Sequence, residues 1–211
     1  MNYKVIGGKK LSGSVRTNIS KNAAVSLLCA SLLNRGTTTL KRMPRIEEVK
    51  RIIEVLKSIG VAVNWLDNGD IVIKPPEKFD LKNIDREAAG KTRSIAMFTA
   101  PLAHVFDSFD LQLPGGCKLG GRTMMPHIQA LGKLGIHLGE NGEGFFHVEA
   151  GDKHAGNIVM FEASDTGTEN ALMAAARIPG VTTIKFASAN YMVQDLCVFL
   201  EQCGVKIEGI G

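Results

Sequence analysis

One short pattern occurs three times in this sequence and limits the possible folds more than any other feature. In each copy, a leucine is followed three residues later by Ile, Leu or Cys, then by glycine and a pair of alternating apolar residues. The copies are Leu56-x-x-Ile59-Gly60-Val61-x-Val63, Leu131-x-x-Leu134-Gly135-Ile136-x-Leu138 and Leu200-x-x-Cys203-Gly204-Val205-x-Ile207. Glycine is typical of a helix end, and alternating apolar residues are typical of a strand. The pattern therefore predicts three copies of one structural unit.

The surrounding sequence extends each copy into a longer α/β unit. A short strand and another helix precede each repeated helix, which gives a helix, strand, helix, strand order. The expected strands are Thr37–Leu40, Phe109–Leu113 and Thr182–Phe186, and the expected preceding helices are Ala23–Leu33, Thr92–Leu102 and Glu169–Ala176. These units are too long for a TIM barrel. The third copy reaches Gly211 without a hairpin and return strand, so we expect a piece of a longer chain.

A glycine-rich segment in the second unit is the main candidate for chemistry. Pro114-Gly-Gly precedes Cys117, and two further glycines separate Lys118 from Arg122. A cysteine on such a shaped loop lies in a positive field, which favours a thiolate or an anionic ligand. The alternative is a plain strand-to-helix connection whose cysteine is small, buried and inert.

Composition excludes several classes of function. The 211 residues are 45% apolar and 22% charged, with a net charge of +4 from dispersed basic residues. This balance does not indicate nucleic-acid binding, and no apolar run approaches a membrane span. The four cysteines show no CxxC spacing, which favours reduced thiols and a cytoplasmic location. The histidines do not cluster as metal ligands, and we expect neither a metal nor a cofactor.

These motifs together resemble the enolpyruvyl transferases, in the branch whose acceptor is UDP-N-acetylglucosamine. The resemblance rests on the repeated unit, the Pro-Gly-Gly-Cys loop and Lys21-Asn22 at a helix start, and it runs from about Val5 to Ile207. It implies an α/β (α+β) fold: an inside-out α/β barrel domain built from three repeated βαβαββ-type units. It also implies transfer of enolpyruvyl from phosphoenolpyruvate in the first committed step of peptidoglycan precursor synthesis, as part of cell-wall biogenesis.

The resemblance assigns roles residue by residue. Cys117 matches the general acid of the family, Lys21 a phosphoenolpyruvate ligand, and Asn22 a ligand of both substrates. Arg122 matches the arginine that bridges both substrates, since a guanidinium suits carboxylate and phosphate oxygens. Arg93 matches a residue facing the diphosphate, and Ser164 opens a helix at a phosphate-binding position. Each also has a plainer interpretation: a helix cap for Lys21-Asn22 and Ser164, and a solvated side chain for Arg93.

Some residues depart from the family pattern, mostly on the nucleotide side. Met125 replaces an aspartate that helps to hold uridine, and Glu162 reverses a basic charge near the expected diphosphate. In the third unit, Ala189-Asn-Tyr-Met192 replaces Arg-Glu-Pro-Glu, whereas Asp195 is retained. His127 matches a family histidine, but helix packing explains it equally well. Two alternatives therefore stay open: a divergent non-catalytic paralogue, or enolpyruvyl transfer to another acceptor. The cysteine loop speaks against shikimate 3-phosphate as that acceptor.

The resemblance also implies a division of the chain. Residues 1–20 match the initial strands of a second, mostly absent domain, residues 21–207 match the cysteine-loop domain, and residues 208–211 begin a linker. Because the second domain supplies the other half of the site, we expect the isolated chain to be inactive. The expected partners are small-molecule substrates, with no nucleic acid and no membrane.

Overall fold

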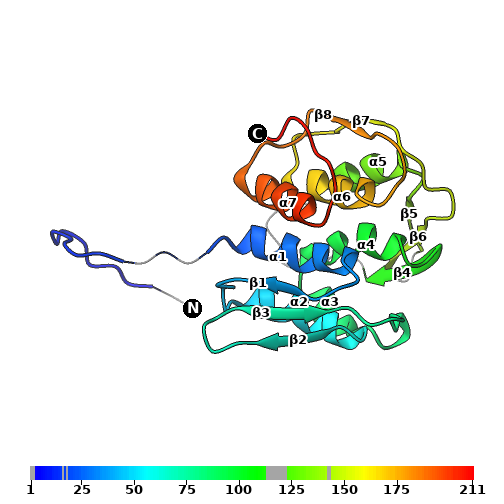
Figure 1. The fold of residues 1–211 in the computed structure, drawn as a ribbon. Helices are drawn as coiled ribbons and strands as arrows, with labels where there is room; N and C mark the ends of the chain where they lie inside the picture. The colour runs from blue at the N-terminus through cyan, green and yellow to red at the C-terminus, as the bar shows by residue number, and fades with distance from the viewer. Residues whose placement is uncertain (1–2, 16, 18, 113–122, 142–143) are drawn as a thin grey trace.

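The computed structural model describes residues 3–15, 17, 19–112, 123–141 and 144–211, and three repeated units make up its body (Figure 1). The first unit contains α1 (Lys21–Ala30), η1 (Ser31–Leu33), β1 (Thr38–Leu40), α2 (Glu47–Ser58), β2 (Ala62–Trp65) and β3 (Ile71–Lys74). The second contains η2 (Leu81–Asn83), α3 (Arg86–Gly90), η3 (Arg93–Phe98), α4 (Thr99–Ala103), β4 (Ser108–Gln112), α5 (Met125–Gly132), β5 (His137–Glu140) and β6 (Phe145–Glu149). The third contains β7 (Asn157–Val159), α6 (Asp165–Ala175), β8 (Thr183–Lys185) and α7 (Tyr191–Gln202).

The repeated glycines end helices, as the sequence predicts. Gly60, Gly135 and Gly204 all have positive φ angles, of 93°, 75° and 94°. In each copy the N–H after the glycine donates to the carbonyl oxygen of the repeated leucine at 3.0 Å. This bond closes the helix end and turns the chain into the next strand. The repeated leucines Leu56, Leu131 and Leu200 are fully buried, which confirms that these helices pack inward.

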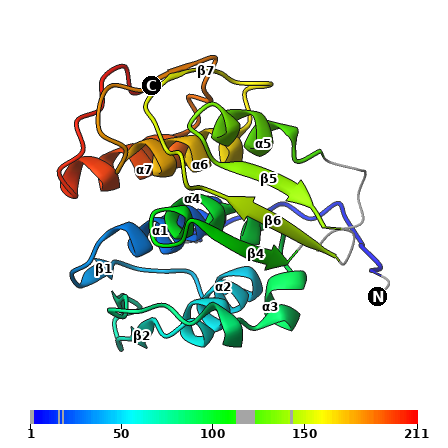
Figure 2. The ribbon, with the colours of Figure 1, turned by 90° about the vertical axis from the view of Figure 1, so that its right-hand side faces the viewer.

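The strands form three small separate sheets. Two are antiparallel and have the orders β1-β3-β2 and β4-β6-β5, whereas β7 and β8 form a parallel pair. The three sheets lie on the outside of the molecule, and α1, α4 and α6 lie between them (Figures 1 and 2). The central helices α1, α4 and α6 are therefore inside and the sheets outside, as expected, although the described strands close no continuous barrel.

The central helices are buried nearly all round, and this shapes their sequences. α1 and α6 are rich in alanine, and they bury polar residues as well as apolar ones. α2, by contrast, carries a single apolar stripe and a charged outer face. Since small side chains let helices approach closely, the alanine-rich segments form the helical centre.

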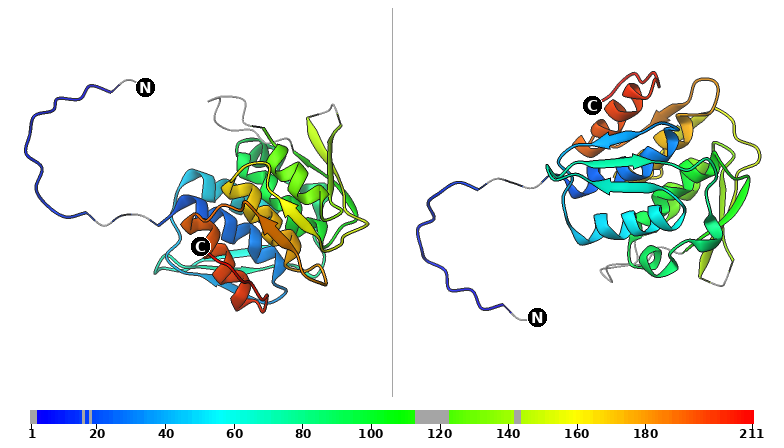
Figure 3. Two further views of the ribbon diagram at one scale, coloured as in Figure 1. Left: turned by 90° about the horizontal axis from the view of Figure 1, so that it is seen from above. Right: turned by 60° about the horizontal axis from the view of Figure 1, so that its bottom comes forward.

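The described residues between 3 and 19 extend away from this body (Figures 1 and 3). Their described members form neither helix nor strand and are almost all exposed. The strands expected here are thus not formed, because a strand needs a partner for its backbone hydrogen bonds. The assignment of this segment to a second domain stays a prediction.

Candidate functional site

The described candidate residues all lie at helix starts. Lys21 and Asn22 are exposed in the first turn of α1, Arg93 opens η3, and Ser164 caps α6. Cys117 and Arg122 lie outside the described residues. The described part of the candidate site therefore lies at the N-terminal ends of helices, where backbone N–H groups carry partial positive charge.

Serine and threonine caps fix these helix starts. Ser20 Oγ accepts from the N–H of Ala23, and Thr92 Oγ1 accepts from the N–H of Ser94, both at 3.2 Å. Ser164 Oγ likewise accepts from the N–H of Gly167 at 3.2 Å. The cap of α1 is thus Ser20 and not the Lys21-Asn22 pair, which leaves both of those side chains on the surface. Ser164 does cap its helix, and its hydroxyl proton can still bind a ligand.

Glu48 in the first turn of α2 connects two of these helix starts. Its Oε2 lies 2.5 Å from Nζ of Lys21. Its Oε1 accepts from the Thr92 and Ser94 hydroxyls at 3.0 and 2.5 Å. Burial alone would raise the pKa of Glu48, but the hydrogen bonds from Lys21 and Ser94 outweigh it and lower that pKa. Sequence reasoning missed Glu48, because its place in α2 resembles that of any charged surface residue.

Arg93 joins the start of η3 to the segment before α5. Its Nη2 donates to the carbonyl oxygen of Thr123 at 2.8 Å. Thr123 directly follows residues 113–122, so Arg93 lies beside one end of the predicted cysteine loop.

His127 connects α5 to α6, and Asn170 connects α6 to the other helices of the second unit. Asn170 Oδ1 accepts from the N–H of Ala100 at 3.3 Å, and its Nδ2 donates to the carbonyl oxygen of Ala96 at 2.9 Å. That Nδ2 also lies 3.1 Å from Nδ1 of His127, so Nδ1 accepts. The neutral ring then carries its proton on Nε2, which donates to Thr166 Oγ1 at 3.2 Å.

The environment of His127 keeps its ring neutral. Burial, and then the nearby charge of Arg93, lower the pKa of His127 to about 4. The packing interpretation of this histidine is therefore correct in part. It is a buried residue that bonds to α6, the helix that Ser164 caps, and its partner Asn170 bonds in turn to η3.

The start of α6 carries two carboxylates, Glu162 and Asp165, of which the sequence pattern indicated only Glu162. Asp165 follows the cap, and its carboxylate accepts from the Ser188 hydroxyl at 2.5 Å and from Asn190 Nδ2 at 3.3 Å. Glu162, just before the cap, is exposed. A diphosphate at this helix start would lie near two carboxylates, which oppose it electrostatically.

The helix starts of the first and third units also meet. Ser20 Oγ lies 3.1 Å from the hydroxyl oxygen of Tyr191, the first residue of α7. The helices α1, η3, α5, α6 and α7 are thus linked by hydrogen bonds near their N-terminal ends. Such an arrangement can bind anionic oxygens through backbone N–H groups and nearby cations.

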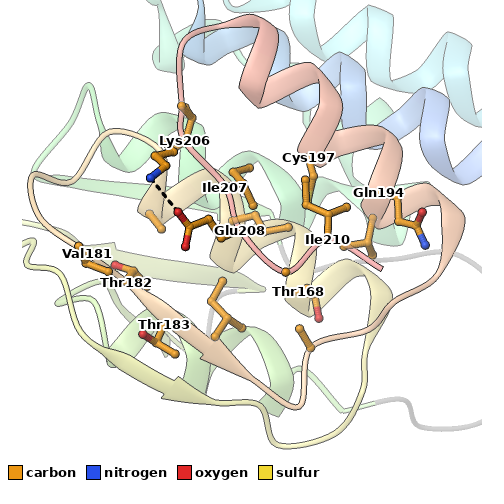
Figure 4. A pocket seen from close by; sticks show the side chains of 18 of the residues that line it. Thr168, Val181, Thr182, Thr183, Gln194, Cys197, Lys206, Ile207, Glu208 and Ile210 are labelled. Atoms are coloured by element: carbon orange, nitrogen blue, oxygen red, sulfur yellow. Dashed lines mark ion pairs between the residues drawn. The ribbon is translucent and has the colours of Figure 1, made fainter.

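A separate hollow of about 650 Å³ lies elsewhere, between α6, α7, β8 and residues 205–211 (Figure 4). None of the candidate site residues that the structure describes lines it. Within the described residues, no group of three or more His, Cys, Asp or Glu side chains could hold a metal ion. No helix in the described part of the chain has the length and apolarity to cross a membrane.

The described cysteines correct one expectation. Cys29 and Cys197 are buried, as their helical positions predict. Cys203 occupies the position of the buried Ile59 and Leu134 in the repeat, and the repeat therefore predicts that it lies in the core, but it is exposed. In the first two units, Asp80 and His154 donate from their N–H groups to the carbonyl oxygens of Ile59 and Leu134, and no described residue makes such a bond to Cys203.

Comparison with known proteins identifies relatives over nearly the whole chain. Residues 5–211 match the family model described as EPSP synthase (3-phosphoshikimate 1-carboxyvinyltransferase). A UDP-N-acetylglucosamine 1-carboxyvinyltransferase of Campylobacter fetus subsp. fetus is 36% identical over all of this chain and 50% of its own length. Another, from Helicobacter pylori (strain Shi470), is 32% identical over 99% of this chain and 49% of its own length. The chain thus spans about half the length of these curated relatives.

Solved structures support the fold. The enolpyruvyl transferase NikO from Streptomyces tendae superposes with a TM-score of 0.82 at 18% identity, over 97% of this chain and 48% of that one. An EPSP synthase from Acinetobacter baumannii superposes with a TM-score of 0.62 at 17% identity, over 82% and 40%. Likeness at such low identity concerns the fold alone.

Proposed function

Because the chain belongs to the EPSP synthase (3-phosphoshikimate 1-carboxyvinyltransferase) family, we propose that it is the cysteine-bearing part of an enolpyruvyl transferase. The reaction joins the C2 carbon of phosphoenolpyruvate to a hydroxyl oxygen of the acceptor and releases inorganic phosphate. The acceptor in this proposal is UDP-N-acetylglucosamine, as in the names of the relatives. The product would be a peptidoglycan precursor made in the cytoplasm.

One structural observation carries the proposal. Lys21, Arg93 and Ser164 belong to three different units of the chain, yet all lie at helix starts. Glu48 joins the starts of α1 and η3, and Asn170 joins α6, the helix that Ser164 caps, to η3. Cations and helix starts stabilise the charge that develops on a departing phosphate. The clustering supports a site for anionic substrates at this end of the helical layer.

Each candidate residue has a distinct role in this proposal. Lys21, Asn22 and Arg122 bind phosphoenolpyruvate, while Cys117 donates a proton to its terminal alkene carbon. For the sugar nucleotide, the ligands are Asn22, Arg93, Arg122 and Ser164.

The charges at α6 favour a second candidate, in which the acceptor is not a nucleotide diphosphate. Asp165 and Glu162 flank Ser164, where the diphosphate would bind, and both carboxylates would weaken the binding of the diphosphate. A non-catalytic binding paralogue is the third possibility, since the same departures would also arise in a chain that has lost the reaction.

Binding measured on the 211-residue chain separates these candidates. Amide NMR spectra would be recorded while phosphoenolpyruvate or UDP-N-acetylglucosamine is added. We expect both ligands to shift the amide resonances of residues at the helix starts. We also expect Arg93→Gln to weaken the binding of the sugar nucleotide. Arg177→Gln is the matched control, because Arg177 is exposed just beyond the opposite end of α6.

The pattern of responses decides the outcome. Shifts with phosphoenolpyruvate alone would favour another acceptor, and shifts with neither ligand would contradict the enzyme proposal. We also expect this chain by itself to release no phosphate from the two substrates, because the resemblance places the remaining catalytic groups in a second domain.

A further inference from the structure

The solvent face of the sheet β4-β6-β5 carries polar side chains that the proposed function does not use (Figure 2). β4 alternates buried apolar and exposed polar residues, so Ser108 and Asp110 point outward. β6 alternates in the same way and turns His147 to the same face. Because the register pairs Asp110 with His147, these two side chains meet across the strands.

Ser108, His147 and Asp110 are hydrogen-bonded in a row. Nδ1 of His147 lies 2.7 Å from Oδ1 of Asp110, and Nε2 of the same ring lies 3.3 Å from Oγ of Ser108. A carboxylate can only accept, so Nδ1 carries the proton of the neutral ring, and Nε2 accepts from the Ser108 hydroxyl. The order of hydroxyl, imidazole and carboxylate is that of a nucleophile, its base and the group that orients the base.

A second carboxylate also faces this histidine. Oε1 of Glu149 lies 3.9 Å from Nε2 of His147. Asp110 and Glu149 therefore both stabilise the positive charge that the ring acquires when it takes the proton of Ser108. The same two carboxylates oppose the approach of an anion, so the group suits a neutral reaction partner.

A hollow of about 300 Å³ adjoins His147 on the β5 side. Gly139, which the register pairs with His147, contributes no side chain there. A Cβ on Gly139 would meet no atom of the described residues within 4 Å. His137 and Glu149 also line the hollow. The base therefore has room beside it for a small group.

We propose that Ser108 is a nucleophile that accepts an acyl group from small, neutral, activated esters. Oγ of Ser108 bonds to the carbonyl carbon of the ester while the hydroxyl proton passes to Nε2 of His147. The bond from that carbon to the leaving oxygen then breaks, and His147 returns the proton to the departing oxygen. Ser108 ends as an ester, and the leaving group ends as an alcohol. Asp110 is a positioning residue, because it fixes the ring through Nδ1.

The exposure of this group explains why the ester must be activated. The side chains of His147 and Asp110 are 44% and 55% exposed, so water surrounds the charge that develops on the acyl oxygen. A preorganised donor in a closed site is worth about 10²–10³ in rate. On this open face we therefore expect aryl esters to react, and alkyl esters and peptide bonds to remain intact. Ser108 lies at the opposite end of β4 from residues 113–122, and the inference does not depend on the proposed function.

A fluorophosphonate probe tests the nucleophile directly, because an activated serine hydroxyl attacks its phosphorus and releases fluoride. The 211-residue chain would be incubated with excess probe, and the labelled peptides would be quantified over time by mass spectrometry. We expect Ser108 to be labelled at least about a hundredfold faster than Ser12, an exposed serine of the N-terminal segment. Acetylation by p-nitrophenyl acetate should show the same preference for Ser108 over Ser12.

Three substitutions assign the roles. His147→Gln should slow the labelling of Ser108 to the rate of Ser12, because the base is lost. His154→Gln is the matched control, since it changes another exposed histidine, and should leave the rate unchanged. Asp110→Ala should slow the labelling and also move the ring proton of His147 from Nδ1 to Nε2. The ¹⁵N chemical shifts of the His147 ring report that change, which a merely structural role of Asp110 would not produce.

The comparison of the two serines in the unsubstituted chain does not depend on the folding of any variant. If Ser108 and Ser12 are labelled at the same rate, Ser108 is an ordinary hydroxyl and the proposal is wrong. Equal labelling of Ser108 in the parent and in His147→Gln would also overturn it, because His147 would then not act as the base. Unchanged ring ¹⁵N shifts in Asp110→Ala would contradict the positioning role of Asp110.

Discussion

Replacement of Glu169 by glutamine should stabilise the protein at neutral pH. The Glu169 side chain lies inside the helical centre with 1% of its surface exposed. Neither carboxyl oxygen has a hydrogen-bond partner among the described residues. The nearby Ser26 hydroxyl donates instead to the carbonyl oxygen of Ala23. A buried carboxylate without partners is costly, so the group takes up a proton.

The size of the effect follows from the pKa. Burial raises the pKa of Glu169 from 4.5 to about 8, with the Ser26 hydroxyl opposing this shift and Asp165 adding to it. Between these two pH values the folded state binds a proton that the unfolded state has lost, so stability falls as pH rises. Each pH unit costs about 1.4 kcal/mol, which amounts to about 3 kcal/mol at pH 7.

Glu169→Gln removes this cost because glutamine never ionises. Urea unfolding at several pH values between 5 and 8 would measure the difference. We expect variant and parent to be similar near pH 5 and the variant to be more stable by about 3 kcal/mol at pH 7. Glu162→Gln, at an exposed position, is the matched control and should change little. If Glu169→Gln is less stable at pH 7, or keeps the parent's pH dependence, the raised pKa of Glu169 does not lower the stability of the parent and the reasoning is wrong.

Three further predictions concern the core, the site and the loop. Leu131→Ala should cost about 2 to 5 kcal/mol in urea unfolding, because it leaves a cavity at a fully buried repeat position. Glu48→Gln should cost about 1 kcal/mol at pH 7 and nothing at acidic pH, since the lowered pKa of Glu48 stabilises the fold only while it is ionised; equal losses at both pH values would contradict this. Peptide mapping after alkylation should show Cys117 labelled before Cys203, which is exposed as a residue but whose pKa is raised by partial burial of its thiol; the reverse order would argue against an activated loop.

The sequence was sufficient for the features that depend on neighbouring residues. The helix ends at Gly60, Gly135 and Gly204 need only a residue with a positive φ angle and the carbonyl of the repeated leucine four positions before it, and both are visible in the repeat. The burial of Leu56, Leu131 and Leu200 also follows from local apolar spacing. Local chemistry likewise makes Ser164 a helix cap, which was one of the two interpretations offered.

The tertiary structure decided everything that depends on residues far apart in the chain. Glu48 meets Lys21 and Ser94 only because α1, α2 and η3 converge, and no spacing in the sequence indicates this contact. Asp165 is held by Ser188 and Asn190 in the same way. Cys203 repeats the pattern of two core residues and is nevertheless exposed, because burial depends on what packs against a position and not on the residue that occupies it.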